Sequence, residues 1–149
     1  MELPTEGIEF ANAAEWRSWL ETHHAKRSEA WLVIHKVKFS HLGIGLEEAV
    51  KQALCFGWID GTLRKRDEET YLLRFSPRRA QSVWSIRNVR RAERLILEGT
   101  MTSAGLEKIK EAMENGHWEA AHLRENTDEI PQRLRKALSR KKGALAAYR

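Results

Sequence analysis

One carboxylate and several guanidinium groups occur close together in the middle of this sequence, and such a combination can bind an anion. Asp60 lies near the start of a predicted strand, and Arg74, Arg78 and Arg79 lie on the next predicted strand and just beyond it. Neighbouring antiparallel strands place such residues side by side. We therefore expect a carboxylate beside guanidinium forks, which favour carboxylate and phosphate ligands.

A predicted helix start follows these arginines. Ser85 is of the residue type that caps helices, and the first amides of a helix favour a bound anion. Trp84 could stack on a ring or an arginine, and Asn88 lies one turn into the helix. The predicted small-anion site thus contains Asp60, Arg74, Arg78, Arg79, Trp84, Ser85 and Asn88. The alternative is structural: Asp60 pairs internally with Arg78 or Arg79, and Ser85 only caps the helix.

Two other kinds of binding are compatible with the sequence. Arg87, Arg91 and Arg94 recur at the spacing of one helix face, and a second basic group, which includes Arg133, Lys136 and Arg140, lies near the C-terminus. These residues predict, as an alternative, nucleic-acid binding that weakens steeply with salt. A third hypothesis is a protein–protein adaptor that uses an apolar surface.

The sequence contains no recognisable catalytic or metal-binding motif. Cys55 lies among apolar helix residues, which is typical of a buried, inert thiol, and the six histidines show no zinc-ligand spacing. No phosphate-binding glycine loop and no nucleophile elbow is present. We therefore expect no metal and no cofactor, and a binding protein rather than an enzyme; the alternative is a hydrolase or transferase that uses Asp60 as its base.

Composition indicates a folded protein with an uneven charge distribution. The 149 residues are 42% hydrophobic and carry a net charge of +5. Residues 64–94 hold 10 basic and 4 acidic residues, whereas residues 95–130 hold 3 and 8. Two basic segments separated by an acidic one indicate local anion-binding surfaces. No membrane span is predicted, and the start MELPTEGIEF does not resemble a signal peptide, so we expect a cytoplasmic protein.

The hydrophobic pattern predicts an α+β fold, with a small, mainly antiparallel sheet packed with helices and a helical C-terminal half. Residues 1–149 are expected to form a single domain, with the sheet in residues 1–84 and helices in 85–149. We predict helices at 13–22, 46–56, 86–98, 103–115 and 132–142, a strand candidate at 7–10, a central strand at 29–37, a hairpin of strands 58–65 and 70–75, and an acidic connector at 125–129. On the helix after Ser85, Ile86, Val89, Ala92 or Glu93, and Ile96 are expected to face inward.

Several motifs resemble those of the YdeI/OmpD-associated family of bacterial bacteriocin-protection proteins. They are FANAAEWRSWL (10–20), AWLVIHK (30–36), EAVKQALCFGWIDG (48–61), RFSPRR (74–79), SVWSIRN (82–88) and LILEGTMTSAG (95–105). The resemblance implies a role in envelope-stress resistance and an envelope or porin-related protein partner, without an established reaction. It also implies that family members continue beyond the basic C-terminal helix, so that the C-terminal helical part is truncated here.

Overall fold

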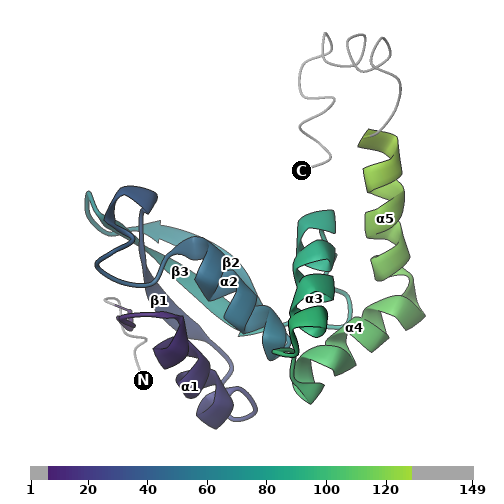
Figure 1. Cartoon of the computed structure of the whole chain (residues 1–149), viewed down its shortest axis with the longest axis horizontal. Helices are drawn as coiled ribbons and strands as arrows, with labels where there is room; N and C mark the ends of the chain where they lie inside the picture. The colour runs from purple at the N-terminus through teal and green to yellow at the C-terminus, as the bar shows by residue number, and fades with distance from the viewer. Residues whose placement is uncertain (1–6, 129–149) are drawn as a thin grey trace, which may run out of the picture.

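The computed structural model describes residues 7–128, in which a small sheet with two helices is joined to three further helices (Figure 1). The elements in chain order are α1 (Ala13–His23), β1 (Ala30–His35), the 3-10 helix η1 (Val37–Phe39), α2 (Leu46–Cys55), β2 (Trp58–Lys65), β3 (Thr70–Pro77), α3 (Ile86–Glu98), α4 (Ser103–Asn115) and α5 (His117–Asp128). This confirms the predicted α+β class. The predicted helix at 132–142 lies outside the described residues.

Local capping explains where three of the helices begin. The side chains of Asn12, Ser85 and Thr102 accept hydrogen bonds from the backbone N–H groups of Glu15, Asn88 and Gly105, respectively. Each bond satisfies one amide that has no partner within the helix. At the other end of α3, Gly99 takes a left-handed conformation with φ of 77°, which glycine adopts at little cost. The starts of α1, α3 and α4 are thus encoded locally, as predicted.

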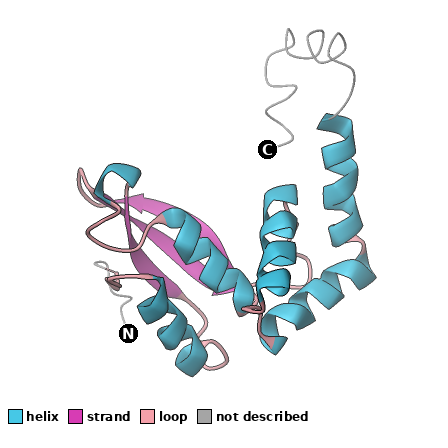
Figure 2. Cartoon of the chain, in the orientation of Figure 1, coloured by secondary structure: helices cyan, strands magenta, loops and turns pink. Residues whose placement is uncertain are grey.

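The three strands form one antiparallel sheet in the order β1-β3-β2 (Figure 2). The predicted hairpin of β2 and β3 is confirmed. The prediction that residues 29–37 form the central strand is wrong, because β3 occupies the centre and β1 pairs with only one strand. Residues 7–10 contribute a single bridge, in which Ile8 lies parallel to Leu32 on β1. All six residues of β1 are nevertheless buried, so an edge strand here has the apolar sequence pattern that is typical of a central strand.

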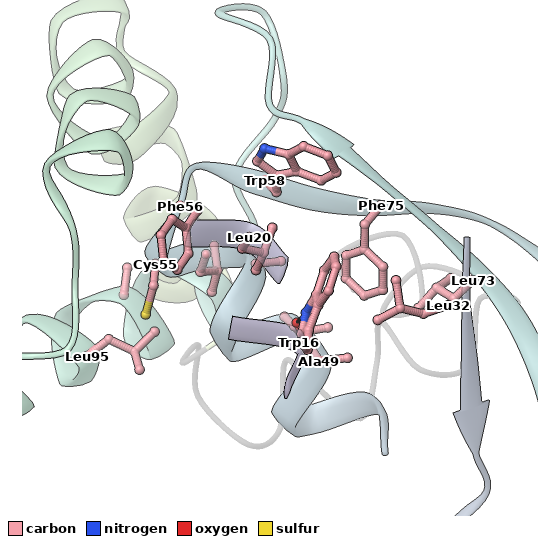
Figure 3. Packing of buried hydrophobic residues seen from close by; sticks show 14 of the residues in the cluster. Trp16, Leu20, Leu32, Ala49, Cys55, Phe56, Trp58, Leu73, Phe75 and Leu95 are labelled. Carbon is pink, nitrogen blue, oxygen red and sulfur yellow. Dashed lines mark hydrogen bonds between the residues drawn. The ribbon is translucent and has the colours of Figure 1, made fainter. Parts of the chain in front are cut away.

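Tryptophan and phenylalanine side chains fill the space between the sheet and the first two helices (Figure 3). Trp16 of α1 is fully buried, and its indole N–H donates to the carbonyl of Ala49 on α2 at 3.0 Å. Its ring also contacts Phe75 of β3, with ring centres 5.5 Å apart, and Trp58 of β2 at 6.4 Å. One aromatic side chain therefore ties together two helices and two strands.

The helical half packs onto the C-terminal end of α2 through a close backbone contact. The hydroxyl and the N–H of Thr102 both donate to the carbonyl of Cys55. A Cβ placed on Gly105 would lie 2.6 Å from that same carbonyl oxygen and 2.7 Å from the carbonyl oxygen of Leu54. Only a residue without a side chain allows α4 to approach α2 this closely.

Two details of the helical half differ from the prediction. The predicted acidic connector at 125–129 is wrong, because α5 continues to Asp128. On α3 the buried residues are Val89, Ala92 and Leu95, whereas Ile96, expected to face inward, is 42% exposed. The buried face is therefore rotated by one residue at this end of the helix.

In residues 7–128 no helix is both long and apolar enough to cross a membrane.

Replacing Gly105 with alanine should lower the free energy of unfolding by about 1–3 kcal/mol, because the new methyl group would press against carbonyls that cannot move independently of α2. Urea unfolding followed by tryptophan fluorescence measures the change. The exposed neighbour Ser103, replaced with alanine, is the matched control and should change stability by less than about 0.5 kcal/mol. Equal stabilities for the two variants would contradict the proposed packing constraint.

Candidate functional site

Arg78, the centre of the predicted anion site, is buried. Its side chain is only 2% exposed, and its guanidinium carbon lies 4.0 Å from the centre of the Trp84 ring. Nη1 donates to the carbonyl of Val83 at 3.2 Å, and the backbone N–H donates to Gly57 at 2.8 Å. Within residues 7–128, Nε and Nη2 have no hydrogen-bond partner. Arg78 thus connects the end of β3 to the segment that leads into α3.

Burial and a nearby carboxylate act in opposite directions on Arg78. Burial lowers the pKa of the Arg78 guanidinium to about 10, and the negative charge of Asp60 partly opposes this effect. The group therefore remains charged at neutral pH. Asp60 lies opposite Phe75 in the sheet and also acts electrostatically on Arg91 of α3. The structure thus brings Asp60, Arg78 and Arg91 into one electrostatic neighbourhood.

The polar side chains around the start of α3 already have partners. Ser85 Oγ accepts from the N–H of Asn88 at 3.1 Å, and Asn88 Oδ1 accepts from Arg91 Nη1 at 2.8 Å. The Trp84 ring packs edge-on against Trp118, and Arg124 donates to the Trp84 carbonyl. These contacts are those expected of a helix start that organises the fold.

Arg74 and Arg79 do not join this neighbourhood closely. Asp60 is paired with Phe75 and therefore shares its face of the sheet. Arg74 precedes Phe75 on β3 and is paired with Trp31, so its side chain lies on the opposite face from Asp60. It forms an ion pair with Glu29 at 2.5 Å. Arg79 is exposed, and its backbone binds Ser82: the Arg79 N–H donates to Ser82 Oγ at 3.0 Å, and the Arg79 carbonyl accepts from the Ser82 N–H at 3.0 Å.

The basic face of α3 lines an open groove between α2 and α3. The groove has a volume of about 970 Å³. Its lining residues are Glu47, Lys51, Arg87, Arg90, Arg91, Glu93, Arg94, Leu95, Leu97 and Glu98. All three described members of the predicted nucleic-acid stripe, Arg87, Arg91 and Arg94, lie here. Arg133, Lys136 and Arg140 lie outside the described residues.

Ion pairs hold several of the groove side chains in place. Arg91 binds Glu47 of α2 through two bonds, of 2.9 Å and 2.7 Å. This hydrogen bonding lowers the pKa of the Glu47 carboxyl and raises that of Arg91, so both groups are charged at neutral pH. Arg94 pairs with Glu98 on its own helix at 3.3 Å. The predicted outward stripe is therefore only partly free, because Arg91 turns toward α2.

Sequence reasoning did not identify Glu47, Lys51 or Arg90 as groove residues. Glu47 lies 44 positions before its partner Arg91. No short-range pattern predicts that contact, since it depends on how α3 packs against α2. The acidic first turn of α2 was visible in the sequence, but it is equally typical of a helix that stabilises its own N-terminus.

Other chemistries receive no support from the geometry of residues 7–128. Cys55 is fully buried, and burial raises the pKa of its thiol, so the group is protonated at neutral pH. In this part of the chain no three His, Cys, Asp or Glu side chains are placed to hold a metal ion together.

A family model described as a domain of unknown function (DUF8412) matches residues 8–108. The chain belongs to this family. The matched segment of the DUF8412 domain includes the sheet, α1, α2 and α3, and therefore every residue that lines the groove. No curated protein and no solved structure matches the chain.

The membership in DUF8412 corrects the expected family. The resemblance to YdeI/OmpD-associated proteins is wrong, because the matching family model is a different one. The residues that carried this resemblance include the buried tryptophans of the core and the helix cap Ser85. Such residues stabilise a fold and do not by themselves identify a family. The implied envelope-stress role, the porin-related partner and the inferred truncation of the C-terminal part lose their basis with it.

Replacing Arg78 with methionine should leave the free energy of unfolding within about 1 kcal/mol of the original or raise it. Methionine keeps the apolar contact with Trp84 and removes two buried donors that lack partners in residues 7–128. Replacing Arg78 with lysine should lower the free energy of unfolding by about 1–3 kcal/mol, because lysine keeps the buried charge but cannot stack flat on the Trp84 ring. Urea unfolding of both variants measures this. A methionine variant less stable than the lysine variant would contradict this account of Arg78.

Proposed function

We propose that this chain is a binding protein for a small phosphate-bearing ligand, held in the groove between α2 and α3. The observation that carries the proposal is the gathering of five cationic side chains around one open groove, with three carboxylates among them. The cations are Lys51, Arg87, Arg90, Arg91 and Arg94. This proposal moves the predicted anion site from the buried Arg78 to the exposed face of the neighbouring helix.

Arg87 is the cation best placed to receive a ligand. It is exposed near the N-terminus of α3, and no hydrogen bond or ion pair joins it to another side chain in the described part of the chain. The first turn of α3 adds the positive end of the helix dipole next to it. The charge of Arg87 helps to lower the pKa of the Glu47 carboxyl, but a phosphate at Arg87 would displace no hydrogen bond or ion pair among the described residues.

Neighbouring cations are available at small cost. Lys51 Nζ lies 3.6 Å from Glu48 Oε2. In the Arg94–Glu98 pair, the two side chains are 79% and 51% exposed, respectively. Exposed pairs of this kind contribute only about 0–1 kcal/mol, so a phosphate can replace the carboxylate partner. Arg91, fixed by Glu47, would instead supply positive charge from a constant position.

The groove also offers an apolar contact. Leu97 lines it and is 87% exposed, next to the buried Leu95. A volume of about 970 Å³ is at the upper end of the range of small-molecule sites. A ligand that combines phosphate with a ring, such as a nucleotide, would use both the arginines and the leucine.

The carboxylates favour a compact anion over a nucleic acid. Glu47, Glu93 and Glu98 all line the groove and would repel the successive phosphates of a long strand. A small ligand can place its phosphate beside Arg87 and avoid them. We place this binding in the cytoplasm, which agrees with a buried, unpaired Cys55.

Replacing Arg87 with alanine should weaken the binding of ADP, used as the probe, about tenfold, because a charge-assisted hydrogen bond to phosphate is lost. Isothermal titration calorimetry measures the affinity. Lys110→Ala removes the same charge from an exposed position on α4 and should change the affinity less than about twofold. Absence of ADP and pyrophosphate binding, or equal effects of the two substitutions, would refute the groove assignment.

Salt dependence separates a small ligand from a nucleic acid. A single-stranded oligonucleotide of about 20 residues should bind no more tightly than ADP at about 150 mM salt, because the groove contacts only a few phosphates. Fluorescence anisotropy at a series of salt concentrations tests this expectation. Tight oligonucleotide binding whose affinity falls steeply with salt would instead establish the nucleic-acid alternative.

A further inference from the structure

The strand β2 forms an open edge of the sheet. It pairs with β3 on one side, and in residues 7–128 no backbone hydrogen bond joins 58–65 to any other segment. Residues 61–65 are all exposed. The opposite edge differs, because Ile8 bonds to the backbone of β1 at 2.7 Å and 3.0 Å. The edge of β2 therefore offers unpaired N–H and C=O groups to another strand.

A bulge places two opposite charges on one face of this edge. Asp60 is paired with Phe75 and Lys65 with Tyr71, and the register shifts between Asp60 and Leu63. Tyr71 and Phe75 lie on the same face of β3, so Asp60 and Lys65 share that face as well. In a regular strand, residues five positions apart would lie on opposite faces. The bulged edge therefore carries a carboxylate near one end and an ammonium group at the other, on one side of the sheet.

Neither of these charges has a partner in the described part of the chain. Asp60 and Lys65 form no hydrogen bond or ion pair with another side chain in residues 7–128. The Asp60 carboxylate acts electrostatically on Arg78 and Arg91, but those guanidinium groups bond to other residues. Both charges are therefore available to a partner strand.

An antiparallel second copy of β2 matches this pattern. When Asp60 of one strand lies opposite Lys65 of the other, a two-fold axis relates the strands and the same pairing occurs twice. The paired side chains lie on the same face, so two ion pairs form. Arg64 lies opposite Gly61, which has no side chain to obstruct it. Leu63, which is 58% exposed, lies next to the axis, where the second copy can cover it.

We propose that two copies of this chain associate by antiparallel pairing of their β2 edges, which joins the two sheets into one. Lysine and arginine on an edge strand usually prevent such pairing. Here they select the register: a copy shifted so that Arg64 lies opposite Lys65 would bring like charges together, whereas the proposed register sets Lys65 against Asp60. The contact covers only residues 60–65 of each strand, so the association is weak.

Sedimentation equilibrium of the full chain tests the proposal. It should show a reversible monomer–dimer equilibrium with a dissociation constant on the order of 100 μM. Lys65→Glu should weaken the dimer about tenfold, because the two-fold axis converts two attractions into two repulsions. Lys110→Glu makes the same charge change at an exposed position on α4 and should alter the dissociation constant less than about twofold. A monomer at all concentrations up to about 1 mM would overturn the proposal and leave the edge to a segment of another protein.

Two further variants locate the contact. Leu63→Lys places a positive charge beside the axis in each copy and should weaken the dimer at least as much as Lys65→Glu. Asp60→Lys should not self-associate, but mixed with Lys65→Glu it should form a heterodimer in which both ion pairs are restored. A dimer unaffected by Leu63→Lys and Lys65→Glu would overturn the β2 assignment. No β2 residue lines the groove, so Lys65→Glu should bind ADP normally, and the two proposals can fail independently.

Discussion

The close contact between Gly105 and the last carbonyls of α2 determines how the two halves of this protein fit together. Because the backbone of α4 lies against Leu54 and Cys55, the hydroxyl of Thr102 reaches the Cys55 carbonyl and fixes the turn between α3 and α4. The position of α3 beside α2 follows from this contact. The groove between those helices therefore depends on a glycine that lies outside its lining.

Charge is distributed to match this architecture. The arginines of α3 line one wall of the groove, and Glu47 and Lys51 of α2 line the other. The Glu47–Arg91 pair spans the groove and holds its two walls in register. Buried Arg78 has a different role, since its guanidinium stacks on Trp84 and links the sheet to the start of α3. The same residue type thus serves packing at Arg78 and, in the function proposed above, ligand contact in the groove.

Features encoded over a few residues could be predicted, and those that depend on long-range packing could not. The caps Asn12, Ser85 and Thr102 and the hairpin of β2 and β3 follow from local residue types. The burial of Arg78 could not be predicted, because its neighbour Trp84 closes over it only when α3 is in place. The five consecutive apolar residues of β1, 30–34, predicted a central strand, whereas β3 separates β1 from β2. Lys51 became a candidate ligand contact only through the spatial arrangement.

The central claim is that the α2–α3 groove is where the anion binds, and mapping the binding site residue by residue tests it most directly. In a titration of the labelled protein with pyrophosphate followed by two-dimensional ¹H–¹⁵N NMR, the largest shifts should occur at Lys51, Arg87 and their neighbours along α3. Shifts confined to Arg79 and the loop before Trp84 would contradict the account and return the site to the end of β3. Absence of any shift would contradict anion binding itself.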